Sequence, residues 1–181
     1  GVFARWFSPD GSPLTGEVAI NETTTRSQGY STVAAAPNGE FLFAWSDNAT
    51  IWKRRFDATG VALGSQTVVD NSSGNDRQDP AIAFASDGSY VIAFNVRYLN
   101  NREWEIHLTQ YDAAGTLQFF HDVTNAQSHQ TRPEVAFLAD DRFIVSYVAS
   151  SSSAETGVIT RTYDTSGNAL TVATRVALDI D

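Results

Sequence analysis

The chain has 181 residues, with 12 Lys and Arg against 21 Asp and Glu, a formal net charge of −9, and neither Cys nor Met. The lack of Cys excludes disulfide-stapled mini-proteins, zinc ribbons and thiol enzymes, and the acidic balance argues against a nucleic-acid partner, which needs a basic face. The apolar content of 42% is that of a folded chain rather than a disordered one. No apolar run approaches the roughly 18 residues of a membrane span, so we expect no membrane insertion.

An internal repeat runs through the whole chain. Four segments have an aromatic residue followed by three residues and Gly: FSPDG (7–11), FDATG (56–60), YDAAG (111–115) and YDTSG (163–167). Between them lies a second set: STVAAAPNG (31–39), PAIAFASDG (80–88) and PEVAFLADD (133–141). Two landmarks that recur in the same order indicate a repeat of about 50 residues.

Each complete unit reads as four short strands, and no window has the apolar period of a helix. Asn38-Gly39 and Asp87-Gly88 predict tight turns between the first and second strands. The Asp-x-x-Gly segments predict a turn in which Gly takes a positive φ and Asp binds nearby backbone. The first strands are expected at 32–36, 81–85 and 134–139, the second at 41–45, 90–94 and 143–147, the third at 50–56 and its equivalents, and the fourth at 66–69, 119–123 and 174–178.

The first two strands of each unit are apolar at nearly every position, which indicates burial on both faces, whereas strands of a two-layer sandwich would alternate. Small residues recur in the first strand, at Ala34, Ala83 and Ala136. These features are typical of β-propeller blades. We predict an all-β fold of four-stranded antiparallel propeller blades, with a β-sandwich and a linear stack of β-meanders as alternatives. In such blades we expect the recurring arginines to bind backbone or an Asp of a neighbouring blade: Arg5, Arg54 and Arg161.

The repeats predict a single repeat domain of about 3.5 blades. A half-blade with only the third and fourth strands occupies 1–22, and blades follow at 23–73, 74–126 and 127–181. A propeller ring usually has four or more blades, so the first and last units should expose strand edges and apolar faces. We expect those faces to bind another copy or another fragment of the same longer protein, within a larger propeller or assembly.

Three segments carry the clearest form of the repeat: QTRPEVA (130–136), DGSYVIAF (87–94) and IWKRRFDATG (51–60). They resemble a tandem repeat of large secreted bacterial adhesins and surface proteins, whose pattern is approximately Q-x-x-P-x-V-A, then D-G-x-F-V-V-x-W, then I-x-x-R-x-F-D-x-x-G. The chain departs from it at Ser31, which replaces Pro, at Asp141, which replaces the turn Gly, and at Gln78, which lies one residue closer to its Pro. The resemblance implies an extracellular or cell-surface location, and attachment or ligand binding more often than catalysis.

Few residues suggest catalysis or metal binding. Glu103 and Glu105 share one strand face, and glycoside hydrolysis uses two carboxylates, but we interpret this pair as solvated edge charges. Each Asp-x-x-Gly turn offers a single carboxylate, whereas calcium needs several converging oxygens. Turn formation accounts for those Asp residues, so we predict no cofactor; calcium at the turns is the alternative for Asp57, Asp112 and Asp164.

The residues that differ between units are the best candidates for binding. In a propeller, the connections between second and third strands lie on the same face as those that enter the next first strand. Aromatic rings combined with arginines and amides suit a polar, ring-shaped ligand such as a sugar. Amides that bind loop backbone and aromatics that pack are the alternative. The predicted ligand-binding residues are Arg97, Tyr98, Trp104, Gln28, Gln78, His129, Gln130 and Arg132.

Three functions remain open at this point. The first is a non-catalytic ligand-binding or adhesion module of a secreted or cell-surface bacterial protein, with carbohydrate as the ligand. The second is a structural segment whose role is assembly within a larger propeller. The third is a fragment of a glycoside hydrolase, for which the sequence offers no pair of acids in a convincing position.

Overall fold

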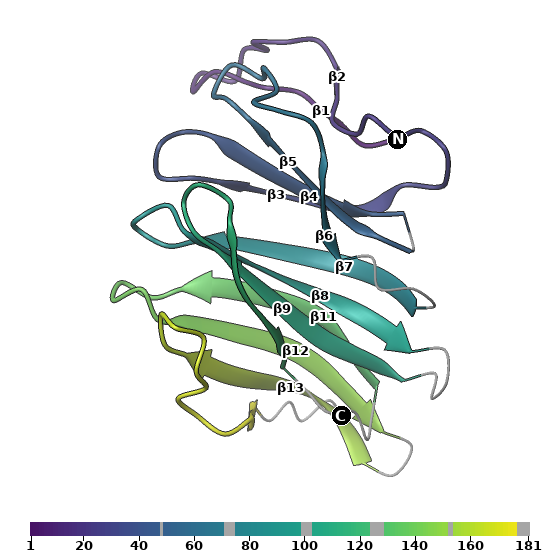
Figure 1. Ribbon diagram of the computed structural model, residues 1–181, viewed down its shortest axis with the longest axis vertical. Coiled ribbons are helices and arrows are strands. Elements are labelled where there is room, and N and C mark those ends of the chain that lie inside the picture. The colour runs from purple at the N-terminus through teal and green to yellow at the C-terminus, as the bar shows by residue number, and fades with distance from the viewer. Residues whose placement is uncertain (48, 71–74, 99–102, 124–128, 152–153, 177–181) are drawn as a thin grey trace.

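The computed structural model describes the chain except for residues 48, 71–74, 99–102, 124–128, 152–153 and 177–181 (Figure 1). All regular elements in this part of the chain are strands. The half-blade consists of β1 (Phe3–Ala4) and β2 (Val18–Ala19). The first blade consists of β3 (Gly29–Ala35), β4 (Phe41–Ser46), β5 (Ile51–Phe56) and β6 (Thr67–Asp70). The second consists of β7 (Asn75–Phe84), β8 (Tyr90–Tyr98), β9 (Trp104–Tyr111) and β10 (Leu117–Asp122), and the third of β11 (His129–Phe137), β12 (Phe143–Ser151), β13 (Ala154–Tyr163) and β14 (Thr174–Val176).

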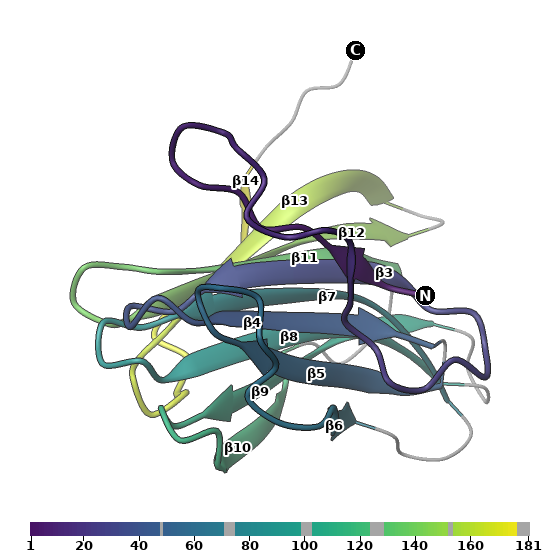
Figure 2. The ribbon, with the colours of Figure 1, turned by 90° about the horizontal axis from the view of Figure 1, so that it is seen from above.

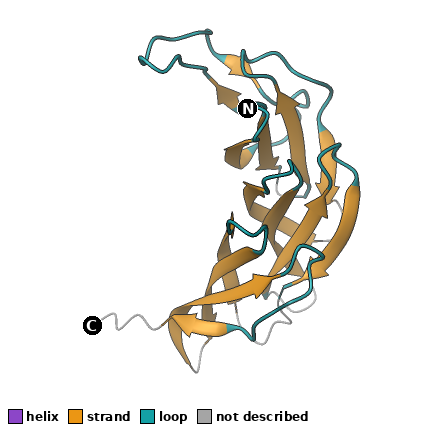
Figure 3. Cartoon of the chain, turned by 90° about the vertical axis from the view of Figure 1, so that its left-hand side faces the viewer, coloured by secondary structure: helices purple, strands orange, loops and turns teal. Residues whose placement is uncertain are grey.

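The strands form three four-stranded sheets and one two-stranded sheet, each antiparallel and each in chain order. The sheets follow one another along the long axis of the molecule (Figure 1) and describe an open arc (Figure 3). The first strands of the blades, β3, β7 and β11, contact one another in turn, while β6 and β10 lie on the opposite side (Figure 2). This arrangement confirms the predicted all-β fold of propeller blades. No described segment is a helix long and apolar enough to cross a membrane.

The hydrophobic core is divided into three clusters, one between each pair of neighbouring units. The second strand of a blade contributes to two of them: in β8, Ile92 and Phe94 pack toward the first blade, while Val91 and Ala93 pack toward the third. All four are fully buried, and each large apolar side chain buried in this way contributes about 1.5–3 kcal/mol. The unbroken apolar run of the second strand therefore reflects the stacking of blades on both faces.

The prediction that first strands are buried on both faces is wrong for the first and third blades. Every described side chain of β7 in the central blade is at least partly buried. In β3, however, Val33 is 51% exposed on the face toward the half-blade, whose described strands β1 and β2 leave it uncovered. In β11, Glu134 and Ala136 on the opposite face are exposed in the same way. Burial of a first strand thus depends on a complete blade on each side.

The recurring arginines bind backbone across the blade interfaces. Arg54 donates a 2.9 Å hydrogen bond from Nη1 to the carbonyl oxygen of Ile20 in the half-blade. Arg161 donates a 3.1 Å bond to the carbonyl oxygen of Val123 in the second blade. Thr109 takes the same position in the second blade, where it is fully buried and bonds within its own sheet. The expectation for Arg54 and Arg161 is confirmed.

The turn between the first and second strands needs a residue with positive φ. Gly39 and Gly88 adopt φ of 87° and 86°, and Asp141 adopts 59° in the third blade. The Asp141 carboxylate accepts hydrogen bonds from the backbone N–H and the hydroxyl of Ser86, at 3.0 and 2.9 Å, in the matching turn of the second blade. The departure from Gly that the sequence shows is therefore linked to a contact between blades.

Candidate functional site

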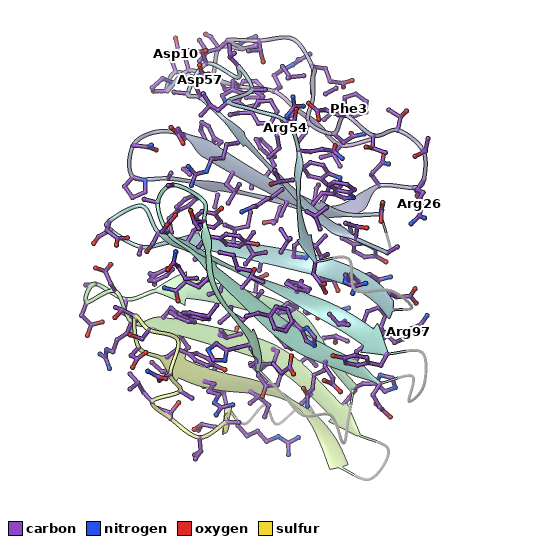
Figure 4. The ribbon with its side chains drawn as sticks, viewed as in Figure 1. Phe3, Asp10, Arg26, Arg54, Asp57 and Arg97 are labelled. Carbon is purple, nitrogen blue, oxygen red and sulfur yellow. The ribbon has the colours of Figure 1, made fainter. Side chains whose placement is uncertain are left out.

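The N-terminal ends of the first and third strands and the C-terminal ends of the second and fourth strands share one end of the blades, which we call the loop face. Figure 4 shows Arg26 and Arg97 projecting from this end, while Asp10 and Asp57 lie at the opposite end with the Asp-x-x-Gly turns. The candidates from the sequence gather on or near the loop face. Several of them lie in strands rather than in loops, because β7, β8 and β11 extend further than predicted.

The extension of the first strands depends on a repeated β-bulge. One residue of each first strand is left over in the pairing with the second strand, and it adopts a left-handed conformation, which costs about 1–3 kcal/mol for a residue other than Gly. The bulge lets pairing continue past Pro80 and Pro133, which cannot donate a backbone hydrogen bond. We call the left-handed residues the bulge residues: Tyr30 (φ 50°), Asp79 (φ 50°) and Arg132 (φ 56°).

Asp79 is the bulge residue with the most distinctive environment. Asn95 of β8, itself 1% exposed, donates a 2.9 Å hydrogen bond from Nδ2 to Asp79 Oδ2. Burial raises the pKa of the Asp79 carboxyl, and the positive charge of Arg132 on the next blade opposes that rise. A carboxyl in this setting accepts hydrogen bonds when ionised and donates one when protonated. No repeat or motif in the sequence pointed to Asp79 as a candidate.

Arg97 and Trp104 form a contact on the loop face. They pair across β8 and β9, and the Arg97 guanidinium carbon lies 5.2 Å from the centre of the indole ring. The guanidinium also forms an ion pair with Asp76 of β7, and both side chains are partly exposed. An aromatic ring, a cation and an anion therefore meet at the solvent boundary.

Tyr98 is directed away from this group. Its hydroxyl lies 3.2 Å from Nε2 of His107, and the same nitrogen lies 3.3 Å from Oδ1 of Asp122 on β10. Burial lowers the pKa of His107, and Asp122 opposes that effect. The Tyr98 hydroxyl is thus engaged in a contact between strands of its own blade, which favours packing over ligand contact for this residue.

The three recurring glutamines do not occupy equivalent positions. Gln28 and Gln130 lie two residues before their bulge residues, whereas Gln78 lies one residue before Asp79 and so points to the other face of the strand. Gln28 accepts a 3.2 Å hydrogen bond from Asn21 of the half-blade. Gln130 is buried.

Arg77 takes the place that a glutamine holds in the other two blades. It is 1% exposed, forms a 2.6 Å ion pair with Asp70 and donates a 2.9 Å hydrogen bond to the carbonyl oxygen of Ala49, both in the first blade. The one-residue offset of Gln78, visible in the sequence, was the signal that could have identified Arg77.

His129 and Arg132 begin the third blade. His129 Nε2 lies 3.6 Å from Oε2 of Glu103 in the second blade, and its side chain is half exposed. Glu103 is therefore part of an interblade contact rather than one of two free acids beside Glu105. Arg132 is exposed and close enough to Asp79 to affect its pKa.

The loop face thus brings together Arg97 with Trp104, His129 with Glu103, and Arg132 with Asp79. The three glutamines do not lie together on this face, and the Tyr98 hydroxyl contacts His107 instead. Among the described residues, no group of three or more His, Asp and Glu side chains could hold a metal ion. At the opposite end, the Asp57 carboxylate accepts hydrogen bonds from the backbone of its own turn, at Thr59 and Val61.

Comparisons with known proteins identify the fold. No family model matches the chain, and a search of the curated proteins found no match, so the resemblance to bacterial surface repeats stays a prediction. Among solved structures, the chain is similar to the Hadza microbial sialidase Hz136, with a TM-score of 0.63 and 9% identity over 79% of this chain and 36% of that one.

Two further structures are similar over a larger share of their length. The α-L-arabinofuranosidase from Lactobacillus brevis matches with a TM-score of 0.55 and 13% identity, over 83% of this chain and 53% of that one. The endo-arabinase from Bacteroides thetaiotaomicron matches with a TM-score of 0.55 and 14% identity, over 96% of this chain and 64% of that one. The chain therefore spans 36%, 53% and 64% of the length of these three structures. At such identities the likeness establishes a shared propeller fold.

Proposed function

We propose that the chain is a non-catalytic, carbohydrate-binding propeller segment of an extracellular or cell-surface protein. The observation that carries this proposal is the group of Trp104, Arg97 and Asp76, partly exposed at the end of a blade. Sugars bind where an aromatic face meets a few fixed polar groups that accept and donate hydrogen bonds to hydroxyls. The similar folds of a sialidase, an arabinofuranosidase and an endo-arabinase support a carbohydrate as the ligand class.

Binding is favoured over hydrolysis by the state of the carboxylates. Glycoside hydrolysis needs an acid and a second carboxylate on either side of the scissile bond. Within the described residues of the loop face, Asp79 is the carboxyl whose pKa is raised. Its neighbours Asp70, Asp76 and Glu103 are each engaged with a basic side chain.

Calorimetric titration with arabino-oligosaccharides and with sialyllactose tests the proposal. We expect Trp104→Ala and Arg97→Ala each to weaken binding about 5- to 30-fold, because each removes on the order of 1–2 kcal/mol of contact. Arg142→Ala is the matched control, since Arg142 forms a similar exposed pair with Asp140 in the turn at the other end of its blade. The proposal is wrong if no glycan binds, or if the control weakens binding as much. If the chain hydrolyses either sugar and Asp79→Asn abolishes that activity, the hydrolase alternative is established.

Assembly with another blade is the second candidate, and the face of the half-blade favours it. Phe3 and Phe7 are 56% and 57% exposed, although the residues at the same positions of the first blade, Trp52 and Phe56, pack against the half-blade. Arg5 stands where Arg54 binds the preceding unit. Sedimentation equilibrium tests the assembly role. Self-association of the parent chain that is lost in Arg5→Glu supports it. A chain that stays monomeric at all concentrations and has no affinity for blades of the same repeat contradicts it.

A further inference from the structure

The chain contains a single lysine, and that lysine lies inside the fold. Lys53 of β5 is 7% exposed. Its Nζ lies 2.7 Å from the hydroxyl of Tyr90 and 3.3 Å from the ring centre of Tyr111, both in the second blade. No carboxylate is bonded to it in the described structure, so a hydroxyl and an aromatic face replace the usual ion pair. Buried amines with such surroundings are candidates for nucleophilic chemistry.

A pocket gives access to this amine. It has a volume of about 190 Å³ and lies between the first and second blades, on the side away from the bulge residues. Its lining includes Lys53, Arg55, Leu63, Tyr90 and Gly115. The pocket is large enough for a small organic molecule and too small for a sugar chain, so its occupant is distinct from the ligand proposed for the loop face.

The charges around the amine favour its neutral, nucleophilic form. Burial, together with the positive charge of Arg55, lowers the pKa of Lys53 from 10.5 to about 7, and the negative charge of Asp112 opposes this to a smaller extent. Burial also raises the pKa of Tyr90, so that its hydroxyl keeps its proton near neutral pH. About half of the Lys53 side chains are therefore uncharged at pH 7, beside a hydroxyl that can donate a proton.

We propose that Lys53 is a covalent binding site for a small aldehyde that carries a carboxylate. The amine nitrogen attacks the carbonyl carbon to give a carbinolamine. Loss of water, whose oxygen comes from the carbonyl group, then leaves a C=N bond, and the reaction consumes no oxidant or reductant. The Tyr90 hydroxyl accepts a 2.7 Å hydrogen bond from Nζ and so holds the amine in position beside the pocket.

Arg55 accounts for the preference for an anionic aldehyde. Its guanidinium carbon lies 5.2 Å from the centre of the Tyr90 ring, the ring whose hydroxyl contacts Nζ. One of its nitrogens donates a hydrogen bond to the carbonyl oxygen of Ala113, and its pairing with Glu40 is loose, at 3.7 Å. Arg55 lines the pocket, and its carboxylate partner is more distant than that of Arg54, whose guanidinium lies 2.8 Å from Glu22 and also bonds to the carbonyl oxygen of Ile20. A carboxylate in the pocket would compete with Glu40 for the Arg55 guanidinium.

Reductive trapping tests the proposal on the intact chain. Glyoxylate is the anionic probe and acetaldehyde the neutral one, each with cyanoborohydride at pH 7, and peptide mass spectrometry locates the secondary amine formed. Because the only other primary amine is the N-terminal one of Gly1, that group serves as an internal reference. We expect folded Lys53 to react with glyoxylate at least tenfold faster than Lys53 in urea, where its neutral fraction at pH 7 is about a thousandfold smaller.

Two variants separate the parts of the proposal. Arg55→Gln should abolish the preference for glyoxylate over acetaldehyde while Lys53 stays reactive, and Arg142→Gln should change neither rate. Far-UV circular dichroism checks that both variants are folded. The proposal is overturned if folded protein is labelled at Gly1 alone while unfolded protein is labelled at both amines, because Lys53 would then be a purely structural residue. It is also overturned if the two probes react equally in the parent chain.

Discussion

Replacement of Lys53 by Met should make the protein more stable at neutral pH. Met is unbranched and apolar and has a similar length, so it fills the space between Tyr90 and Tyr111 without a charge. In the unfolded chain the lysine has its ordinary pKa of 10.5, whereas in the fold its pKa is about 7. At pH 7 the unfolded state therefore binds a proton that about half of the folded molecules lack, and the folded state is the one penalised.

The magnitude follows from that difference in pKa. It corresponds to about 5 kcal/mol at roughly 1.4 kcal/mol for each pKa unit. The variant loses the contact of Nζ with the Tyr90 hydroxyl and the cation–π contact with Tyr111, together about 1–3 kcal/mol. We therefore expect Lys53→Met to gain about 2–4 kcal/mol at pH 7. Because the unfolded state binds more protons, the parent chain should recover this difference at about 1.4 kcal/mol per pH unit as the pH rises above 7.

Urea unfolding of both proteins between pH 7.5 and 9 measures this effect. The tyrosines with raised pKa, such as Tyr163 at about 12, titrate in both proteins and cancel in the difference. The gap in unfolding free energy should close by about 2 kcal/mol over this range. Parallel pH profiles would refute the reasoning, since they would mean that Lys53 keeps the same pKa in the folded and unfolded states.

Three further predictions concern single contacts. Arg161→Met should lower the free energy of unfolding by about 1–2 kcal/mol in urea, because the hydrogen bond to Val123 O is lost; an unchanged midpoint would show that the interblade bond adds nothing. Asp141→Gly should also lower the free energy of unfolding, by about 1 kcal/mol, since the loss of two hydrogen bonds from Ser86 outweighs the backbone strain that Gly relieves at this positive φ. A higher melting temperature would mean that the relief of strain is the larger of the two effects. Asp79→Asn should raise the melting temperature slightly at pH 7 and not at pH 3, because a carboxyl with a raised pKa destabilises the fold only when it is ionised; a gain at both pH values would point to backbone preference instead.

Much of the fold could be predicted because the repeat is local in sequence. The turn glycines at 39 and 88 predict a positive φ, and the unbroken apolar run around Phe94 predicts a strand that is buried on both faces. The arginine that precedes three of the four aromatics by two residues could be assigned a structural role because it recurs with the period of the blades. Each of these signals depends on a few neighbouring residues, so propensity and pattern were enough to interpret it.

The candidate site was harder to predict, because its members are defined by register and by contacts between blades. A one-residue bulge decides that Arg77 rather than Gln78 enters the interface with the first blade, and it places Asp79 beside Asn95 and Arg132. The polar residues around Pro80 looked like a loop, since nothing local showed that pairing resumes beyond the proline.

By itself, the sequence determined that the chain is all-β and built from four-stranded antiparallel propeller units, while the half-blade at 1–22 and the blade boundaries stay predictions. Hydrophobic pattern and turn residues carry that information, because each blade must bury both faces of its second strand. Only the tertiary structure decided which side chains meet: Trp104 with Arg97, and Lys53 with two tyrosines of the next blade. The first contact depends on the register of β8 and β9 within one sheet. The second depends on the stagger and rotation between neighbouring sheets, because Tyr90 and Tyr111 lie in the second blade and Lys53 in the first.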